Sequence, residues 1–343
     1  MKKKLQLRGK RILASRPKKP TLLTFVVLLV IATASTLPGC IIHDNIRLGG
    51  LPLIDALPIH FCLWRPIFKG NMLDVEIKSF STEADRDAAF LLGEVDAMVC
   101  DLPTGILLSA QEQKGKIART IMRATPNMPM FAIVAAPDSI IAHADSLRGM
   151  DIAIPDGVTA QYVTDTLLLS TGIQPNDINR VEVINYETAR GMLQERQVTA
   201  ALLRAPLITA AVADGARIII DDGTISLGVS VLFFSQKTID QRRKAARRFM
   251  FSYEQAVLEI NYRPEEYRAL MVDKGGVPAQ VGAIYPMPVY EGVATVVSET
   301  EVKRVTNWLV KQRLLSQTVS YGDVVTLDLL VDPTSVFRAP CCL

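Results

Sequence analysis

The chain has 343 residues, of which 49% are hydrophobic, 21% charged and only 6% aromatic, so it can fill one or two packed domains and is neither disordered nor collagen-like. The formal charge of +3 comes from the first twenty residues, which hold nine of the 38 lysines and arginines and no acidic residue. The rest carries 29 basic against 35 acidic residues, and this mildly acidic balance argues against a nucleic-acid-binding protein, which needs a basic face.

The first 40 residues have the pattern of an export signal. A basic stretch precedes the uncharged apolar run 21–36, and the small-residue sequence LPGC follows it. This ending resembles a bacterial lipobox, so we expect residues 1–40 to be a lipoprotein signal peptide that ends at the lipidated Cys40. The alternative is an uncleaved membrane anchor, because residues 21–39 nearly reach the ~20 apolar residues of a spanning helix. Both interpretations place residues 41–343 in the cell envelope, tethered to a membrane on its extracytoplasmic (periplasmic) side.

Four cysteines follow this leader. Cys62 and Cys100 lie in apolar runs, which favours buried free thiols. A disulfide is allowed outside the membrane, but the spacing of these two and of the terminal pair, Cys341 and Cys342, does not choose among the three pairings. The sequence therefore leaves the disulfide state open.

The body of the chain repeats itself weakly at a constant offset of 103 residues. Residues 95–103 and 198–206 share valine, alanine and proline at matching positions, and each follows a helix-like stretch. A period of this length indicates a duplicated domain and not a solenoid. Short apolar strands alternate with helices in each half, which predicts parallel βαβ units and an α/β fold with two lobes. The predicted strands are 46–48, 75–80 and 95–100 in the first half and 152–154, 181–184 and 198–203 in the second.

The remaining chain differs in kind. A predicted strand at 229–234 leads into a long helix at 239–261, and we interpret its basic run, 242–248, as a solvated face. Further helical segments are predicted at 265–274, 290–297 and 301–315. This tail is too helical for a third α/β unit, so we expect it to pack on the first lobe.

Several short motifs carry a family resemblance. Residues 93–97 read GEVDA, where the family has G-x-x-D-A, and residues 145–153 read DSLRGMDIA, where it has D-L-x-G-K-x-I-A. Together with RLG at 47–49 and TNWL at 306–309, they make the chain similar to periplasmic substrate-binding proteins of the nitrate, taurine, alkanesulfonate and thiamine-precursor group. The resemblance covers residues 46 to about 332. It implies a type II periplasmic-binding fold and a role as the receptor of an ABC importer, working with a permease and its ATPase.

The resemblance also implies domain boundaries. We expect lobe I to consist of residues 45–132 plus 230–335, and lobe II of residues 133–229. Two hinge strands, near 130–135 and 229–234, are expected to join a parallel-rich, helix-flanked sheet in each lobe. Ligands of open α/β sheets bind outside the carboxyl ends of the strands, and hinge closure around a ligand is the usual motion of two such lobes.

Turns that follow the predicted strands are expected to converge on a cleft between the lobes. The residues expected to bind the ligand are Leu53, Ile54, Asp55, Asp101, Thr104, Phe131, Gly157, Val158, Thr159, Tyr162, Arg204 and Pro206. Among them, Phe131 and Tyr162 would stack on a ring-shaped ligand. Trp64, in contrast, is expected to pack in the core.

Two of these positions have alternative interpretations. The segment 157–159 opens a helix whose free N–H groups suit an anion or a carbonyl oxygen, or else Asp156 or Thr159 only caps that helix. Arg204 would bind a carboxylate, sulfonate or phosphate, or it pairs with Asp101 across the closed cleft and serves closure.

The sequence contains no sign of catalysis or of a cofactor. It lacks a nucleophile elbow, a P-loop and a G-x-G-x-x-G after a strand, and its three histidines lack metal-ligand spacing. We therefore expect a monomeric receptor, not an enzyme, that binds a small organic solute without metal or cofactor. The solute is either a heterocycle similar to a thiamine precursor or an organosulfonate. The first alternative is a sensory or interaction lipoprotein, and the second, which the sequence favours less, is an enzyme of the same fold.

Overall fold

The computed structural model describes residues 44–111, 114–225, 227–332 and 334–335, all within one structural unit that begins at His43. The predicted signal peptide with Cys40, and the terminal cysteines Cys341 and Cys342, lie outside the described residues. No helix in the described part of the chain is long and apolar enough to cross a membrane.

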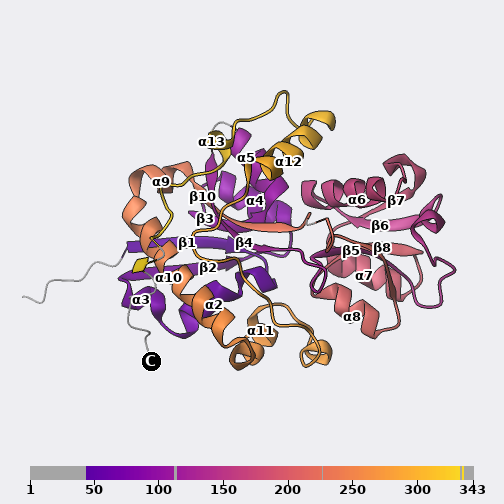
Figure 1. The fold of residues 1–343 in the computed structure, drawn as a ribbon, viewed down its shortest axis with the longest axis horizontal. Coiled ribbons are helices and arrows are strands. Elements are labelled where there is room, and N and C mark those ends of the chain that lie inside the picture. The colour runs from indigo at the N-terminus through magenta and orange to yellow at the C-terminus, as the bar shows by residue number, and fades with distance from the viewer. Residues whose placement is uncertain (1–43, 112–113, 226, 333, 336–343) are drawn as a thin grey trace, which may run out of the picture. The chain divides into compact units, whose positions relative to one another are not determined.

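The described strands form two five-stranded sheets (Figure 1). The first sheet has the order β2-β1-β3-β10-β4 and the second the order β7-β6-β8-β5-β9. In each sheet one strand, β10 or β5, runs antiparallel to its two neighbours, and the other four share one direction. The strands are β1 Asp44–Gly50, β2 Leu73–Ser79, β3 Ala97–Asp101, β4 Gly115–Arg123, β5 Phe131–Ala135, β6 Asp151–Pro155, β7 Asn179–Val183, β8 Ala200–Arg204, β9 Arg217–Asp221 and β10 Val229–Ser235.

Helices cover both sheets. The helices are α2 Leu57–Trp64, α3 Ile67–Gly70, α4 Glu83–Leu91, α5 Leu102–Ala110, α6 Val158–Ser170, α7 Tyr186–Gln194, α8 Leu207–Ala213, α9 Gln236–Gln241, α10 Arg243–Tyr262, α11 Arg268–Lys274, α12 Glu299–Lys311 and α13 Tyr321–Val324. Helices α6, α7 and α8 gather around the second sheet (Figure 1). Helix α10 packs on α2, α3 and β1, and α12 and α13 pack on α5. Parts of the tail thus pack beside the first sheet, and Trp308 of α12 also reaches α6 beside the second.

The duplicated topology explains the 103-residue repeat. Strands β3 and β8, AMVCD and AALLR, are buried along their whole length, as expected where helices cover both faces of a parallel-rich sheet. Asp101 ends β3 opposite Ser230, and Arg204 ends β8 opposite Phe131. The two residues thus hold equivalent places in the two sheets, and the predicted two-lobed α/β class is confirmed.

Two short connections, residues 124–130 and 222–228, join the sheets. The predicted hinge strands are themselves β5 and β10, inside the sheets, and each is preceded by one of these connections. The fully buried carboxylate of Asp222 ties the connections together by accepting hydrogen bonds from the backbone N–H groups of Met130, Phe131 and Gly228, at 2.9, 3.0 and 2.8 Å. A Cβ at Gly228 would lie 2.5 Å from that carboxylate, so the close approach requires glycine.

The structure corrects three local predictions. Residues 290–297 are not helical, because their backbone finds other partners: Glu291 N–H donates to Ile121 O and Thr295 O accepts from Thr120 N–H, both at 2.9 Å. The long helix predicted at 239–261 is two helices, α9 and α10, which meet at Arg242. Trp64 is 56% exposed and not in the core, since its helix turns that side to solvent.

Candidate functional site

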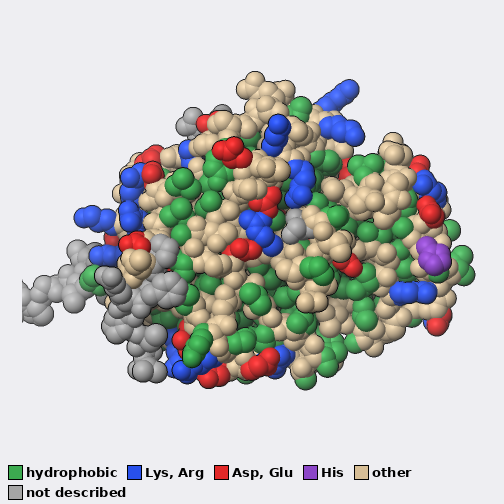
Figure 2. Space-filling view, in the orientation of Figure 1, with side chains coloured by type: hydrophobic (Ala, Val, Ile, Leu, Met, Phe, Trp, Pro, Cys, Tyr) green, Lys and Arg blue, Asp and Glu red, His purple; other side chains and the backbone are tan. Residues whose placement is uncertain are grey.

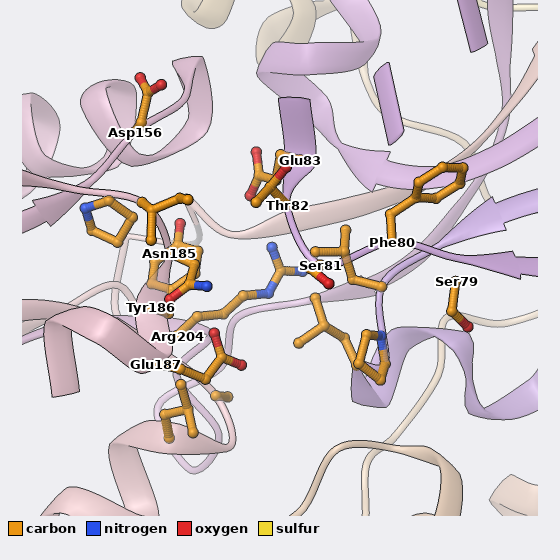
Figure 3. Close-up of a pocket in the computed structure, with 17 residues that line it drawn as sticks. Ser79, Phe80, Ser81, Thr82, Glu83, Asp156, Asn185, Tyr186, Glu187 and Arg204 are labelled. Atoms are coloured by element: carbon orange, nitrogen blue, oxygen red, sulfur yellow. The ribbon is translucent and has the colours of Figure 1, made fainter. Parts of the chain in front are cut away.

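A cavity of about 370 Å³ lies between the two sheets (Figure 3). Its walls come from the carboxyl ends of β1 and β2 in the first sheet and of β6, β7 and β8 in the second, where ligands of α/β sheets bind. The lining residues are Leu51, Pro52, Leu53, Ser79, Phe80, Ser81, Thr82, Glu83, Pro155, Asp156, Ile184, Asn185, Tyr186, Glu187, Arg204, Ala205 and Leu207.

The repeat supplies two matching walls. Thr82 caps α4, with its hydroxyl oxygen accepting from Asp85 N–H at 3.1 Å, and Asn185 caps α7, with its amide oxygen accepting from Thr188 N–H at 2.8 Å. Such caps satisfy backbone donors that a helix leaves free at its first turn. In Figure 3 these segments face each other, with the Arg204 side chain between them.

Arg204 is held by two carboxylates from the other side of the cavity. Its Nη2 donates to Asp55 Oδ2 at 2.8 Å and its Nη1 donates to Asp101 Oδ2. All three side chains are buried, and the guanidinium carbon lies 5.0 Å from the centre of the Phe131 ring. The alternative in which Arg204 pairs with Asp101 across the cleft is therefore what the structure shows, with Asp55 as a second partner.

Burial and the opposite charges act against each other on the pKa values of this group. Burial alone would lower the pKa of Arg204, but the Asp101 and Asp55 carboxylates outweigh it and raise that pKa above its ordinary value. Burial raises the pKa of Asp55, and the charge of Arg204 opposes the rise. Arg204 is thus a permanent cation whose charge two acids share.

Glu83 is the titratable acid of the cavity wall. Burial raises its pKa to about 7, against the opposing effect of the Arg86 guanidinium. One oxygen of its carboxyl group lies 3.4 Å from the position that a Cβ at Gly157 would take. Gly157, with φ of +128°, is the N-cap of α6, and no side chain hydrogen-bonds to that helix start. The capping role considered for Asp156 or Thr159 is therefore wrong, and the acid from the opposite sheet faces this helix end.

Two further contacts join the sheets away from the cavity. The hydroxyl oxygens of Thr104 and Thr159, both buried, lie 3.3 Å apart. The indole N–H of Trp308 on α12 donates to Asp165 Oδ2 on α6 at 3.0 Å, and the Tyr162 ring packs edge-on against the indole. The structure thus has the two lobes in contact on several sides of the cavity.

The residues expected to bind a ligand fall into separate places. Leu53 and Arg204 line the cavity, and Asp55, Asp101 and Phe131 surround the Arg204 guanidinium. The others lie elsewhere.

Those other residues contact protein groups or flank the cavity wall. Ile54 is buried, and its carbonyl oxygen accepts from the Tyr290 hydroxyl at 2.7 Å. Pro206 is buried before α8, and Gly157 and Val158 open α6. Thr104, Thr159 and Tyr162 belong to the two further contacts described above. Whether these positions touch a solute stays a prediction.

Sequence reasoning missed the turns after the second strands. Residues 79–83 include the end of β2 and the turn after it, residues 184–187 follow β7, and together they supply nine of the 17 lining residues. A signal was present, because Thr82 and Asn185 are capping residue types that lie 103 positions apart. Only turns after the first and third predicted strands entered the list of expected binding residues.

Comparisons with known proteins agree with this architecture. Residues 67–267 match the model of a family described as NMT1/THI5 like. No curated protein matches the sequence. Among solved structures, the alkanesulfonate-binding protein SsuA from Xanthomonas axonopodis pv. citri bound to MOPS is similar at 16% identity and a TM-score of 0.67, covering 82% of this chain and 98% of that one.

Two other structures have the same fold. The periplasmic aliphatic sulphonate-binding protein SsuA from Escherichia coli has 17% identity and a TM-score of 0.67, covering 82% of this chain and 92% of its own. The Candida albicans CA3427 gene product, described as having the generic periplasmic binding protein fold, has 13% identity and a TM-score of 0.65, with 80% and 92% covered. At these identities the likeness shows the fold, which is that of periplasmic binding proteins.

Proposed function

This chain belongs to the NMT1/THI5-like family, and on that premise we propose that it is a solute-binding receptor of an ABC importer. It binds a small organic solute in the cavity between the two sheets and delivers it to a permease that works with an ATPase. The names of its structural neighbours support this class, since two of them are sulfonate-binding proteins with the same fold.

The observation that carries the proposal is the cavity itself. It lies at the carboxyl ends of strands from both sheets, and residues from both sheets contribute to its wall. Only the connections 124–130 and 222–228 link β4 to β5 and β9 to β10. Bending at two short connections is how periplasmic binding proteins open and close around a ligand. A solute bound there is enclosed when the lobes meet and released when they part.

We also propose that the receptor binds its solute without changing it. The cavity-lining residues include no cysteine or histidine. Burial raises the pKa values of the Cys62 and Cys100 thiols well above the ordinary value, which disfavours thiolate nucleophiles. In the described part of the chain, no group of three or more His, Cys, Asp or Glu side chains is placed to hold a metal ion. We further propose that the monomeric receptor is tethered on the extracytoplasmic side through Cys40.

A binding assay with a blocked cavity tests the proposal. Residues 41–343 are screened by thermal shift against sulfonates, nitrate, thiamine precursors, amines and amino acids, because a ligand at 100 times its Kd stabilises the native state by about 2.7 kcal/mol. We expect a solute that raises Tm in the parent protein and not in Ser81→Trp, in which an indole fills the cavity. The control is Leu92→Trp, at a position that is 76% exposed and outside the cavity lining. Equal binding by both variants would contradict the proposal.

A further inference from the structure

The charges around the cavity restrict the class of solute that fits it. Glu83, Asp156 and Glu187 line the cavity, and Arg204 is the one cation among the lining residues. Asp156 and Glu187 are exposed at the rim, whereas Glu83 is half-buried. Charges in a partly enclosed site interact more strongly than charges in water. The lining residues of the cavity therefore include more acidic than basic side chains, even when Asp55 and Asp101, the partners of Arg204, are left out.

Arg204 is already paired with two carboxylates. Asp55 accepts from its Nη2 and Asp101 from its Nη1, and all three side chains are buried. Two carboxyl groups thus share one guanidinium. Asp101 Oδ1, a buried oxygen, has no hydrogen-bond partner among the described residues. An oxyanion bound to Arg204 would lie close to the carboxyl groups of Asp55 and Asp101.

Side chains of the protein already lie at the helix N-termini that border the cavity, where they accept hydrogen bonds or add negative charge. Thr82 and Asn185 cap α4 and α7, and Glu83 and Glu187 add a carboxylate to the first turn of each. At the start of α6, the Glu83 carboxyl group faces Gly157 from the opposite sheet. A helix N-terminus attracts an anion through free N–H groups and a positive dipole end. Here acids of the protein already lie at these helix ends, so they attract a second anion much less.

The carboxyl groups that line the cavity or pair with Arg204 thus outnumber its single guanidinium. We infer that the solute carries a cationic group rich in N–H donors, such as an ammonium or amidinium, and not a sulfonate, carboxylate or phosphate. This inference rests on the proposed receptor function and names the chemistry of the solute. Glu83 is the specificity-determining residue, because it lines the cavity and its carboxyl group, from the first lobe, faces Gly157 at the start of α6 in the second.

Charge-matched probes test the inference. The full chain is titrated at pH 8, above the Glu83 pKa of about 7, by calorimetry and thermal shift with benzamidinium, benzamide, benzoate and benzenesulfonate, and with hexylammonium, hexanamide and hexanoate. We expect a cationic member to bind at least tenfold more tightly than its carboxylate isostere. Glu83→Gln and the rim variant Glu187→Gln should each weaken that binding at least threefold. Glu195→Gln, at the other end of α7, keeps the affinity of the parent protein.

The outcomes separate the solute class from the receptor function. Preferential binding of benzoate, benzenesulfonate or hexanoate overturns the cationic assignment but agrees with the proposed receptor function. Binding of the neutral amides alone does the same. If no member of any charge class binds, both the assignment and the proposed function are rejected. Cationic binding that survives Glu83→Gln and Glu187→Gln unchanged places the cation outside this cavity and also overturns the inference.

Discussion

Arg204 is the residue on which the interface between the sheets depends most. It ends β8, reaches across to Asp55 and Asp101, and lies over the Phe131 ring. A buried ion pair adds little net stability compared with apolar residues, but removing one partner leaves an uncompensated buried charge. If Arg204 is removed, the carboxyl groups of Asp55 and Asp101 remain buried without a cationic partner.

Replacing Arg204 should therefore destabilise the protein strongly. We expect Arg204→Met to lower the free energy of unfolding by about 3–5 kcal/mol, measured by urea unfolding at pH 7.5. Arg204→Met combined with Asp55→Asn and Asp101→Asn should recover much of that loss, because no buried charge remains. Arg196→Met removes an exposed pair with Asp138 and should change stability by less than about 1 kcal/mol. An Arg204→Met loss as small as that of Arg196→Met would show that the triad is solvated.

Glu83 should make stability depend on pH. Its pKa is about 7 in the folded protein against an ordinary 4.5, so the folded state binds the proton more tightly. The stability that this proton contributes is complete below the ordinary pKa and is lost as pH rises through about 7. The neutral Glu83→Gln variant has no such loss. Between pH 5 and pH 8 the parent protein should lose roughly 2–3 kcal/mol relative to Glu83→Gln.

Urea unfolding of both proteins at several pH values measures this difference. Comparing the two removes the contribution of other buried acids, such as Asp222, whose pKa burial raises to about 6. Glu195→Gln serves as the control and should follow the parent protein at every pH. Parallel profiles for the parent protein and Glu83→Gln would mean that Glu83 titrates as a solvated acid.

At the scale of elements, α12 joins the tail to both sheets. It packs on α5 beside the first sheet, and its Trp308 hydrogen-bonds to Asp165 on α6 beside the second. The helix starts with a capping box, in which Ser298 and Glu301 accept from each other's backbone N–H groups, so its position is well defined. Helix α12 therefore holds the lobes together on a side away from the cavity.

The chain offers a matched test of this contact, because it has two tryptophans. Trp308→Phe keeps an aromatic ring but removes the N–H that Asp165 accepts, and it should lower the free energy of unfolding by about 1–2 kcal/mol. Trp64→Phe, at a position that is 56% exposed, should change it by less than about 0.5 kcal/mol. Equal effects of the two substitutions in urea unfolding would show that the indole hydrogen bond adds nothing.

At the scale of the whole molecule, the repeat made the architecture predictable. The 103-residue offset and the strand and helix patterns were sufficient for two α/β lobes, because hydrophobic periodicity reflects burial directly. The offset also marked Asp101 and Arg204 as equivalent strand ends, which the sheet register confirms. Their ion pair was one of two interpretations that the sequence left open.

The cavity wall and the hinge were less predictable, because tertiary contacts form them. The residues after β2 and β7 become a wall only when the lobes face each other, and no local pattern encodes that placement. Asp222 joins the two connections by accepting from backbone N–H groups, two of which are distant in sequence, so no local pattern predicted this contact. Residues 290–297 have a helical pattern but hydrogen-bond with the backbone of β4 instead. In each case a partner far along the chain decided the outcome.

We expect the two lobes to close around a solute, and a distance measured between them detects this closure. Spin labels are placed on cysteines at Leu92 and Ile140, exposed positions on the sides of the first and second sheet, with Cys40, Cys341 and Cys342 replaced by serine. Burial protects Cys62 and Cys100 from labelling. We expect the solute to shift the distance distribution to a single shorter distance, and Ser81→Trp to abolish the shift. A solute that binds in this cavity and leaves the distribution unchanged would contradict the account.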